Sequence, residues 1–315
     1  MTTKNKVKFF ILWILGIVLI VFALIRRKKV DEKIFYYISM GTIVEIHSPS
    51  KELADSAFSV VKKLDSLLDP RKENSDLAKI NKNSGKWVKV SKETIECIKK
   101  AIEVAKLTQG NFDPTIYPVL KLWRFHKEKN WKIPPKDSLK KYLKFVDWKK
   151  IKIKKDSVKI MKNQALDLGG IAKGFASQKA IEKLKKLGVK NALVNIGGDL
   201  TTIGKPYKIG IQNPRKKGII KIIKVKNKTV CTSGDYQRFI KSKGKIYYHI
   251  INPKTGFSKK SQFISITVIG EDGALVDGLA TAFFLLNKKD IIKLLKKLHY
   301  KAILIDTNLS IYFYP

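Results

Sequence analysis

Apolar residues recur with helical spacing in several segments of the chain and alternate with polar residues in others. The helical spacing predicts helices at Lys51–Leu68, Ser91–Thr108, Asp137–Val146, Ile171–Leu187 and Asp290–Leu298. The alternation predicts strands at Ile151–Met161, Lys208–Gln212, Ile219–Val225, Ile264–Ile269 and Ala302–Ile305. These strands gather in the second half of the chain and do not alternate regularly with helices. The order favours a mixed α+β domain over a doubly wound parallel sheet.

A long apolar run precedes this domain. Phe9–Ile25 is uninterrupted by charge, with lysines before it and Arg26–Lys29 after it. A helix of this length spans about 25 Å, near the lower limit for crossing a bilayer. No small-x-small cleavage site follows, so we expect an uncleaved single-pass transmembrane anchor in residues 1–30 and a single domain in residues 31–315. Cations flank both ends, so the positive-inside rule does not settle the orientation.

The chain is strongly basic, with a formal net charge of +39. Almost all of the excess is lysine, spread over the predicted helices and loops, and arginine occurs only at positions 26, 27, 71, 124, 215 and 238. Proteins that bind nucleic acids favour arginine and cluster it with aromatic residues, a pattern that this chain lacks. The charge therefore points away from nucleic acid and towards attraction by anionic lipid.

The segment Leu166–Ala176 (LDLGGIAKGFA) predicts the end of a buried strand, a glycine turn, and a helix that begins near Ile171. Glycines and the N–H groups of a helix N-terminus suit a polyphosphate, and Asp167 and Lys173 bring both signs of charge to the same place. A Walker loop is excluded because the Lys and Ser/Thr of that motif are missing. The alternative is tight packing of strand against helix.

A second segment, Val276–Leu286, is an apolar helix interrupted by Asp277, with Thr281 one turn later. At this spacing the carboxylate and the hydroxyl share a helix face. Both are oxygen ligands suited to Mg²⁺, which also keeps waters and substrate phosphates. The alternative is that Asp277 is an acidic residue of the first turn and Thr281 a packed β-branched residue.

Further segments combine polar residues with turn residues in an unusual order along the chain. They are Met40–Thr42, Ser75–Asn81, Asn111–Thr115, Phe112–Phe125, Val194–Leu200, Thr232–Phe239 and Tyr248–Gly256. Taken in this order with the two segments above, they resemble the ApbE family, the FAD:protein FMN transferases. The resemblance extends from about Tyr37 to the end of the chain.

The resemblance implies a single ApbE-like domain and a Mg²⁺-dependent reaction. FAD is attacked at the flavin-side phosphorus, AMP leaves, and FMN becomes joined to a Thr or Ser hydroxyl of a partner protein. Such transfer depends mainly on positioning and on neutralising charge. The acceptor is expected to be a membrane redox subunit, and the catalytic domain is expected outside the cytoplasm. No cysteine lies near the apolar run, so the lipoprotein anchoring common in this family is not available here.

The resemblance also assigns roles to residues. The expected metal ligands are the backbone carbonyl of Gly170 and the side chains of Asp277 and Thr281. The residues expected to bind FAD are Met40, Asn111, Phe112, Asp113, Asp167, Lys173 and Ile251, the last from a strand over the HIINP sequence. His249 and Asp277 are the expected catalytic residues. Since an imidazole titrates near neutral pH, His249 is the candidate for deprotonating the acceptor hydroxyl.

The sequence departs from the family pattern at Arg71, where an aromatic residue is common, and at Asn252, which replaces the usual Asp. An amide still serves as a turn residue before Pro253, but not as a base. Cys97 and Cys231 are expected to be buried free thiols.

Two other functions fit the same motifs. Water could replace the protein hydroxyl, which would make the chain an FAD pyrophosphatase that produces FMN and AMP. A flavin-binding or flavin-delivery protein without turnover is the other alternative, although it would not need both a metal pair and a base.

Overall fold

The computed structural model describes residues 32–125, 131, 133–236, 239–242, 245–258 and 261–314. Lys33–Pro315 forms one compact unit. Phe9–Ile25, the predicted anchor, lies outside the described residues. Within those residues, no helix combines the length and the apolar character that a membrane crossing requires.

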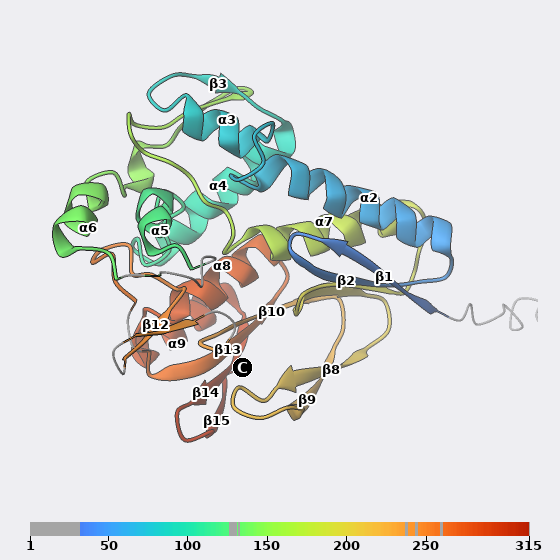
Figure 1. Ribbon diagram of the computed structural model, residues 1–315. Helices are drawn as coiled ribbons and strands as arrows, with labels where there is room; N and C mark the ends of the chain where they lie inside the picture. Colours follow the sequence, from blue (N-terminus) through green and yellow to red (C-terminus); the bar gives the residue numbers. More distant parts are fainter. Residues whose placement is uncertain are drawn as a thin grey trace, which may run out of the picture. The chain divides into compact units, whose positions relative to one another are not determined.

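An eight-stranded sheet, antiparallel at every pairing, forms the centre of the unit (Figure 1). Its order is β1 (Lys33–Ser39), β2 (Thr42–Ser48), β6 (Ala192–Ile196), β7 (Asp199–Ile203), β10 (Thr229–Gly234), β13 (Phe263–Gly270), β14 (Lys301–Asp306) and β15 (Ile311–Tyr314). The mixed α+β class predicted from the sequence is confirmed.

Helices cover one face of this sheet. They are α2 (Lys51–Leu68), α4 (Lys92–Leu107), α7 (Ala172–Lys186), α8 (Gly273–Phe283) and α9 (Lys288–Leu298). α2 lies along α7, and α7 and α8 in turn pack on the middle strands (Figure 1). α2 starts where the Ser50 side chain accepts from the Leu53 N–H, and it buries Ala54, Val61 and Leu64. Burial of such apolar stripes against the sheet forms the main core.

A separate hairpin covers the opposite face. β8 (Tyr207–Gln212) pairs with β9 (Ile219–Val225) as a two-stranded sheet, as their alternation predicts. Tyr207 and Ile209 of β8 pack with Leu193, Leu200 and Val230 of the central sheet. The central sheet is therefore buried on both faces here, with helices on one side and the hairpin on the other.

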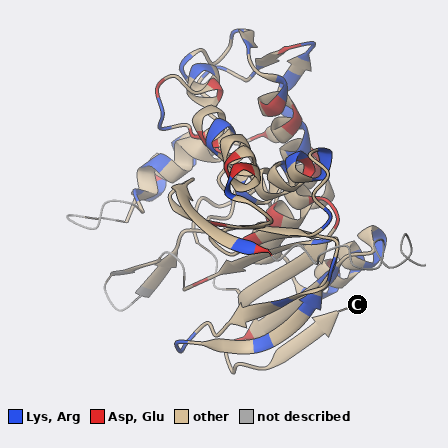
Figure 2. Cartoon of the chain, turned by 90° about the vertical axis from the view of Figure 1, so that its right-hand side faces the viewer, with Lys and Arg blue, Asp and Glu red and all other residues tan. Residues whose placement is uncertain are grey.

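The remaining elements lie around this frame. They are α3 (Asp76–Lys82), α5 (Tyr117–Trp123), α6 (Lys136–Leu143), a 3₁₀ turn at Trp148–Lys150, the small sheet of β3 (Val88–Lys89), β5 (Ser157–Lys159) and β4 (Lys152–Lys154), and the hairpin of β11 (Phe239–Ser242) and β12 (Lys245–Tyr248). Trp123 anchors α5, because its indole N–H donates to the Gly256 carbonyl at 2.7 Å. The lysines and arginines are spread over helices and strands, as expected (Figure 2).

The structure corrects three local predictions. The strand predicted at Ile151–Met161 is instead the β4–β5 hairpin, which turns at Lys155 with φ of 51°. The strand predicted to end near Leu166 does not form, and only an isolated bridge joins Ala165 to Ile116. No strand runs over the HIINP sequence, where Ile251 makes a single bridge to Ser258. In the last two places, apolar residues are buried by tertiary contacts without regular pairing, which periodicity cannot distinguish from a strand.

Candidate active site

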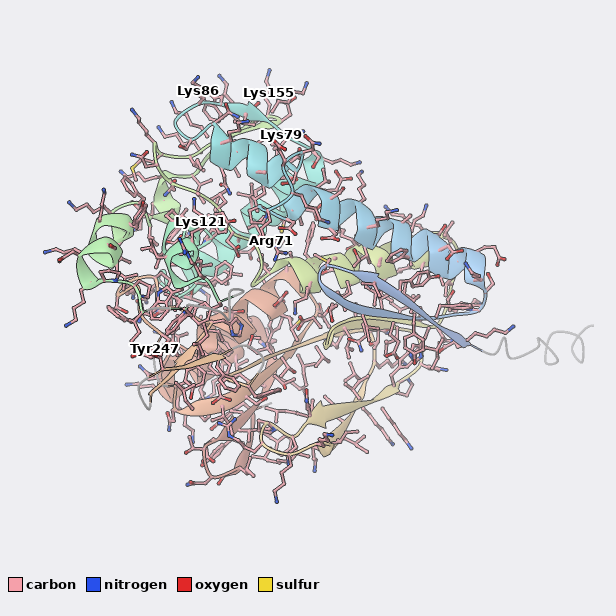
Figure 3. The ribbon with its side chains drawn as sticks, viewed as in Figure 1. Arg71, Lys79, Lys86, Lys121, Lys155 and Tyr247 are labelled. Atoms are coloured by element: carbon pink, nitrogen blue, oxygen red, sulfur yellow. The ribbon has the colours of Figure 1, made fainter. Side chains whose placement is uncertain are left out.

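One cavity of about 390 Å³ lies where α7 and α8 meet the ends of the middle strands β7 and β10. Every residue assigned to the site from the sequence lies on its wall: Met40, Asn111, Phe112, Asp113, Asp167, Gly170, Lys173, His249, Ile251, Asp277 and Thr281. Arg71, beyond the end of α2, and Lys121, on α5, also line it (Figure 3). The fold thus brings together segments that are more than two hundred residues apart.

The floor of the cavity is made where α7 crosses α8. A Cβ at Gly174 would lie 2.6 Å from Cβ of Asp277 and closer still to the Gly273 carbonyl oxygen, so glycine is required for this approach. The Gly174 N–H donates to the Asp277 carboxylate at 2.9 Å. Gly174 therefore packs helix against helix, whereas the packing alternative drawn from the sequence placed a strand against a helix at the Gly169–Gly170 turn.

Asp277 lies in the middle of α8, since Asp272 caps the helix by accepting from the Leu275 N–H. This position excludes the alternative that Asp277 is a residue of the first turn. Its carboxylate is 4% exposed and lies near the carboxylate of Asp199, on β7. Burial and the negative charge of Asp199 raise the pKa of Asp277 to about 7, against the opposing charge of Lys173.

Lys173 forms an ion pair with Asp199, whose other oxygen accepts from the Thr232 N–H at 3.3 Å. Burial lowers the pKa of Lys173, but the attraction of Asp199 and Asp277 outweighs it and the pKa rises above its ordinary value. A lysine between two carboxylates therefore stays charged. Two buried carboxylates, Asp199 and Asp277, still share one cation, Lys173. Burying the unbalanced negative charge destabilises the fold unless a further positive charge binds there.

The oxygen atoms around Asp277 suit such a charge. The Thr281 hydroxyl lies 3.4 Å from the Gly170 carbonyl oxygen, and the Ser233 hydroxyl lies 3.5 Å from that of Thr281. The Cys231 thiol also lies beside Asp199 and Asp277, and burial raises its pKa well above the ordinary value. A protonated thiol is a poor ligand, whereas buried oxygens suit a hard divalent cation. The donor set fits Mg²⁺.

The Asn111–Thr115 loop is held by its own polar side chains. Asp113 accepts from the N–H and hydroxyl of Thr115 at 2.8 and 2.6 Å and from the Trp148 N–H at 3.1 Å. Burial raises the pKa of Asp113. The Asn111 amide donates to the Thr108 carbonyl at 2.7 Å. These bonds fix the shape of the loop that presents Phe112 to the cavity, and the assignment of all three residues to FAD stays a prediction.

The negative charge of Asp167 is attracted by the positive charge of Arg71. Burial raises the pKa of Asp167, while the Gly169 N–H, which donates at 2.8 Å, and the Arg71 charge oppose the rise. Arg71 makes two bonds of 2.9 Å to Asp69. The cavity wall therefore carries at Arg71 a guanidinium that is oriented by Asp69.

The β1–β2 turn brings Met40 to the cavity. Met40 has φ of 52°, a left-handed conformation that costs free energy in a residue with a side chain. Asp65 of α2 holds the turn by accepting from the Met40 N–H at 3.1 Å and from the Ser39 hydroxyl at 2.9 Å. Asp65 therefore affects the cavity indirectly, because it fixes the turn that carries Met40.

His249 follows β12 and lies half-buried on the same wall as Asp277. Its role as a base stays a prediction. Asn252 serves as a turn residue, as expected, with its side chain accepting from the Lys254 N–H at 2.8 Å. Cys97 and Cys231 are buried free thiols, as predicted.

Asp199 and Ser233 also line the cavity, although neither was predicted from the sequence as a site residue. Both belong to segments that the sequence singled out, Val194–Leu200 and Thr232–Phe239. A glycine pair before an acid, and a Thr-Ser-Gly sequence at the end of a strand, were the available signals. Which side chain of each segment faces the cavity depends on the pairing of β7 and β10, which local sequence does not specify.

Comparison with known proteins agrees with this geometry. The sequence profile of the ApbE family matches residues 40–304. An FAD:protein FMN transferase of Haemophilus influenzae is 30% identical over 277 residues, which cover 83% of this chain and 79% of the relative. One of Klebsiella pneumoniae is 27% identical, covering 81% and 83%. The crystal structure of the ApbE protein of Thermotoga maritima superposes with a TM-score of 0.84 at 30% identity, covering 90% and 97%.

Proposed function

Because the chain belongs to the ApbE family, we propose that it transfers FMN from FAD to a hydroxyl group of a partner protein. The observation that supports this most directly is the convergence of its sequence-assigned residues on one cavity around a buried pair of carboxylates. Relatives that cover most of the chain bear the name FAD:protein FMN transferase.

In the proposed reaction, the oxygen of a Thr or Ser hydroxyl bonds to the flavin-side phosphorus of FAD. The bond from that phosphorus to the bridging oxygen breaks, AMP leaves with that oxygen, and the hydroxyl proton passes to a base. His249 is the proposed base, because it shares the cavity wall with the metal-binding group. Lys173 supplies a fixed positive charge beside the departing phosphate.

Mg²⁺ would be held by Asp277, Thr281 and the Gly170 carbonyl, where it would neutralise charge on the pyrophosphate. Asp199 would keep Lys173 in place through their ion pair. Asp167 and the loop at Asn111–Asp113 would position the two ends of FAD across the cavity.

The test is to incubate the full-length protein with FAD, MgCl₂ and unflavinylated candidate membrane redox subunits. We expect flavin fluorescence on the acceptor in a denaturing gel, AMP in equal amount, and loss of both on chelation of the metal. Release of AMP and free FMN without labelling of any acceptor would instead identify an FAD pyrophosphatase. Bound FAD that yields no AMP would identify a carrier.

We further propose that Phe9–Ile25 anchors the protein in the membrane by a single crossing, with the catalytic domain outside the cytoplasm. The support is the length and apolar character of the run and the basic residues beside it.

A further inference from the structure

An apolar patch is exposed along β1, at one edge of the central sheet. Its members are Ile34, Tyr36 and Ile38 of β1 and Ile43 of β2, which are 48%, 65%, 82% and 61% exposed. The three residues of β1 alternate along the strand, so their side chains share one face. Ile43 is paired with Ile38 and lies on that face too. We call these four residues the β1 patch.

The opposite face of β1 is covered by helices. Phe35 and Tyr37 pack against the main core, and the Tyr37 ring stacks on Phe58 of α2 with ring centroids 4.3 Å apart. β1 is therefore apolar on both faces. A strand with one face in water normally carries polar residues on that face, whereas an apolar sequence on both faces is typical of a strand that is covered twice. We therefore expect the β1 patch to have a covering of its own.

The β8–β9 hairpin does not supply this covering. It lies on the same face of the sheet, because Ile34 pairs with His47 and His47 pairs with Leu193, which packs against the hairpin. The apolar cluster beneath the hairpin draws on β6, β7 and β10, and none of its members belongs to β1. Among the described residues, β1 pairs with β2 alone and forms an edge of the sheet (Figure 1). A contiguous exposed patch of this kind marks a surface that meets a protein or a membrane.

The position of the β1 patch in the chain favours a membrane. Ile34 follows Ile25, the end of the apolar run, by only nine residues. Even when fully extended, the seven residues of Arg26–Glu32 reach at most about 25 Å. With Phe9–Ile25 in a bilayer, as proposed above, the β1 patch is confined close to the surface of that bilayer. Such a tether strengthens a contact that would be weak on its own, because it keeps the local concentration of lipid high.

The chemistry of the β1 patch also suits a membrane surface. Tyrosine is enriched where headgroups meet acyl chains, because its ring is apolar and its hydroxyl stays in contact with water. Isoleucine side chains bury apolar area at the same depth. Five cations lie within Arg26–Lys33, directly before the patch, and attract anionic headgroups. A protein partner would also cover an apolar face, but the apolar run and the basic segment beside the patch favour lipid.

We propose that the β1 patch lies against the membrane that holds Phe9–Ile25, with its four side chains among the lipid headgroups. This inference rests on the proposed anchor and adds the way in which the catalytic domain meets the membrane. Ile38 and Ile43 flank the β1–β2 turn, which carries Met40 on the wall of the active-site cavity. The contact would therefore hold this cavity at a fixed distance from the membrane, where a membrane redox subunit would present its hydroxyl.

A fluorescent label on Ile38→Cys tests this contact. The full-length protein is reconstituted, without an acceptor, into vesicles of phosphatidylcholine and phosphatidylglycerol, with the fluorophore NBD on the introduced thiol. Cys97 and Cys231 are buried and should not react. Because an interfacial side chain lies about 5–10 Å deep, we expect a lipid with a nitroxide near its headgroup to reduce the emission at least about twofold. Phe313→Cys is the matched control, since Phe313 is 52% exposed on β15, at the opposite edge of the sheet, and its label should keep its emission.

Tyr36→Cys gives a second position in the β1 patch and should be quenched as Ile38→Cys is. All three variants should bind FAD with the wild-type Kd, which shows that the domain is folded. Unquenched emission at both patch positions, or equal quenching at Phe313→Cys, would overturn the contact. A blue-shifted emission without quenching would also overturn it, and would show that a protein segment or a second copy of the chain covers the patch.

The same preparation separates this contact from the two proposals before it. Protein that fails to float with the vesicles would overturn the anchor and the contact together. Protein that floats but is not quenched at the β1 patch would overturn the contact alone. Transfer of FMN to an acceptor is measured separately, so either result leaves the proposed transferase activity standing.

Discussion

At the scale of single residues, the site is a compromise between burial and charge. Asp277 and Asp199 are buried close together, and Lys173 forms an ion pair with Asp199. A carboxylate there is destabilising unless it is paired, and its persistence on an otherwise apolar helix indicates a function that needs the charge. The crossing of α7 and α8 beside Asp277 also requires glycine at position 174. Packing and chemistry therefore both restrict which residues can stand at these positions.

Asp277→Asn should separate the packing role of this side chain from the chemical role of its charge. The amide keeps the size of the side chain and can still accept from the Gly174 N–H, while removing one of two adjacent negative charges. We expect an unchanged or raised melting temperature and a transfer rate lower by about 100-fold or more. Thr281→Val should be milder, since water can replace a neutral ligand. Asp290→Asn, an exposed acid on α9, is the control. Near-normal transfer by Asp277→Asn at ordinary Mg²⁺ concentration would contradict the assignment.

Gly174→Ala tests the helix crossing. Its new Cβ would meet backbone and Asp277 Cβ, neither of which can move without displacing a helix. We expect the free energy of unfolding, measured in urea, to fall by about 2 kcal/mol or more. Gly169→Ala is the matched control, because its Cβ would meet only the flexible Asp167 side chain, at 3.0 Å. Equal losses in the two variants would show that the crossing tolerates a methyl group.

At the scale of elements, the β8–β9 hairpin is held in place by two kinds of contact. Its core-facing residues pack on the central sheet, and one ion pair ties its turn to the strand end that enters the site. An arginine fork is suited to such a tie because both bonds to the carboxylate fix its orientation.

Arg215→Lys should weaken this tie while keeping the charge. A lysine cannot make both bonds to Asp235, so the buried carboxylate loses a partner. We expect a loss of about 1–2 kcal/mol in unfolding free energy and faster amide hydrogen exchange in β8. The exposed neighbour substitution Lys216→Ala should change neither. Unaltered exchange in β8 would mean that apolar packing alone holds the hairpin.

At the scale of the whole molecule, the central sheet has a different covering on each face. The helix face carries the residues assigned to FAD, and the β8–β9 hairpin covers the other face (Figure 1).

Attachment to the membrane is also a property of the whole molecule. The full-length protein should remain in the membrane fraction after a carbonate wash, because Phe9–Ile25 is long enough to cross a bilayer. A chain that begins at Lys33 should be released into the supernatant. A mature N-terminus beyond residue 25, found by mass spectrometry, would show cleavage instead.

The sequence by itself determined the long helices and the placement of Asp277 and Thr281 on one helix. α2 follows its predicted range residue for residue, because its apolar spacing and the Ser50 cap act within a few turns of one chain segment. The i, i+4 spacing of Asp277 and Thr281 is likewise a local property. Ordered motifs over most of the chain were enough to identify the family.

Only the tertiary structure decided which residues meet. The roles of Asp199 and Ser233 depend on where the β7–β10 ladder stops, and that of Gly174 depends on how α7 crosses α8. β1, β2 and β6 were not predicted, and they are placed by pairing with one another. Strand pairing and helix crossing join residues distant in sequence, and their free energy comes from contacts that no short segment contains.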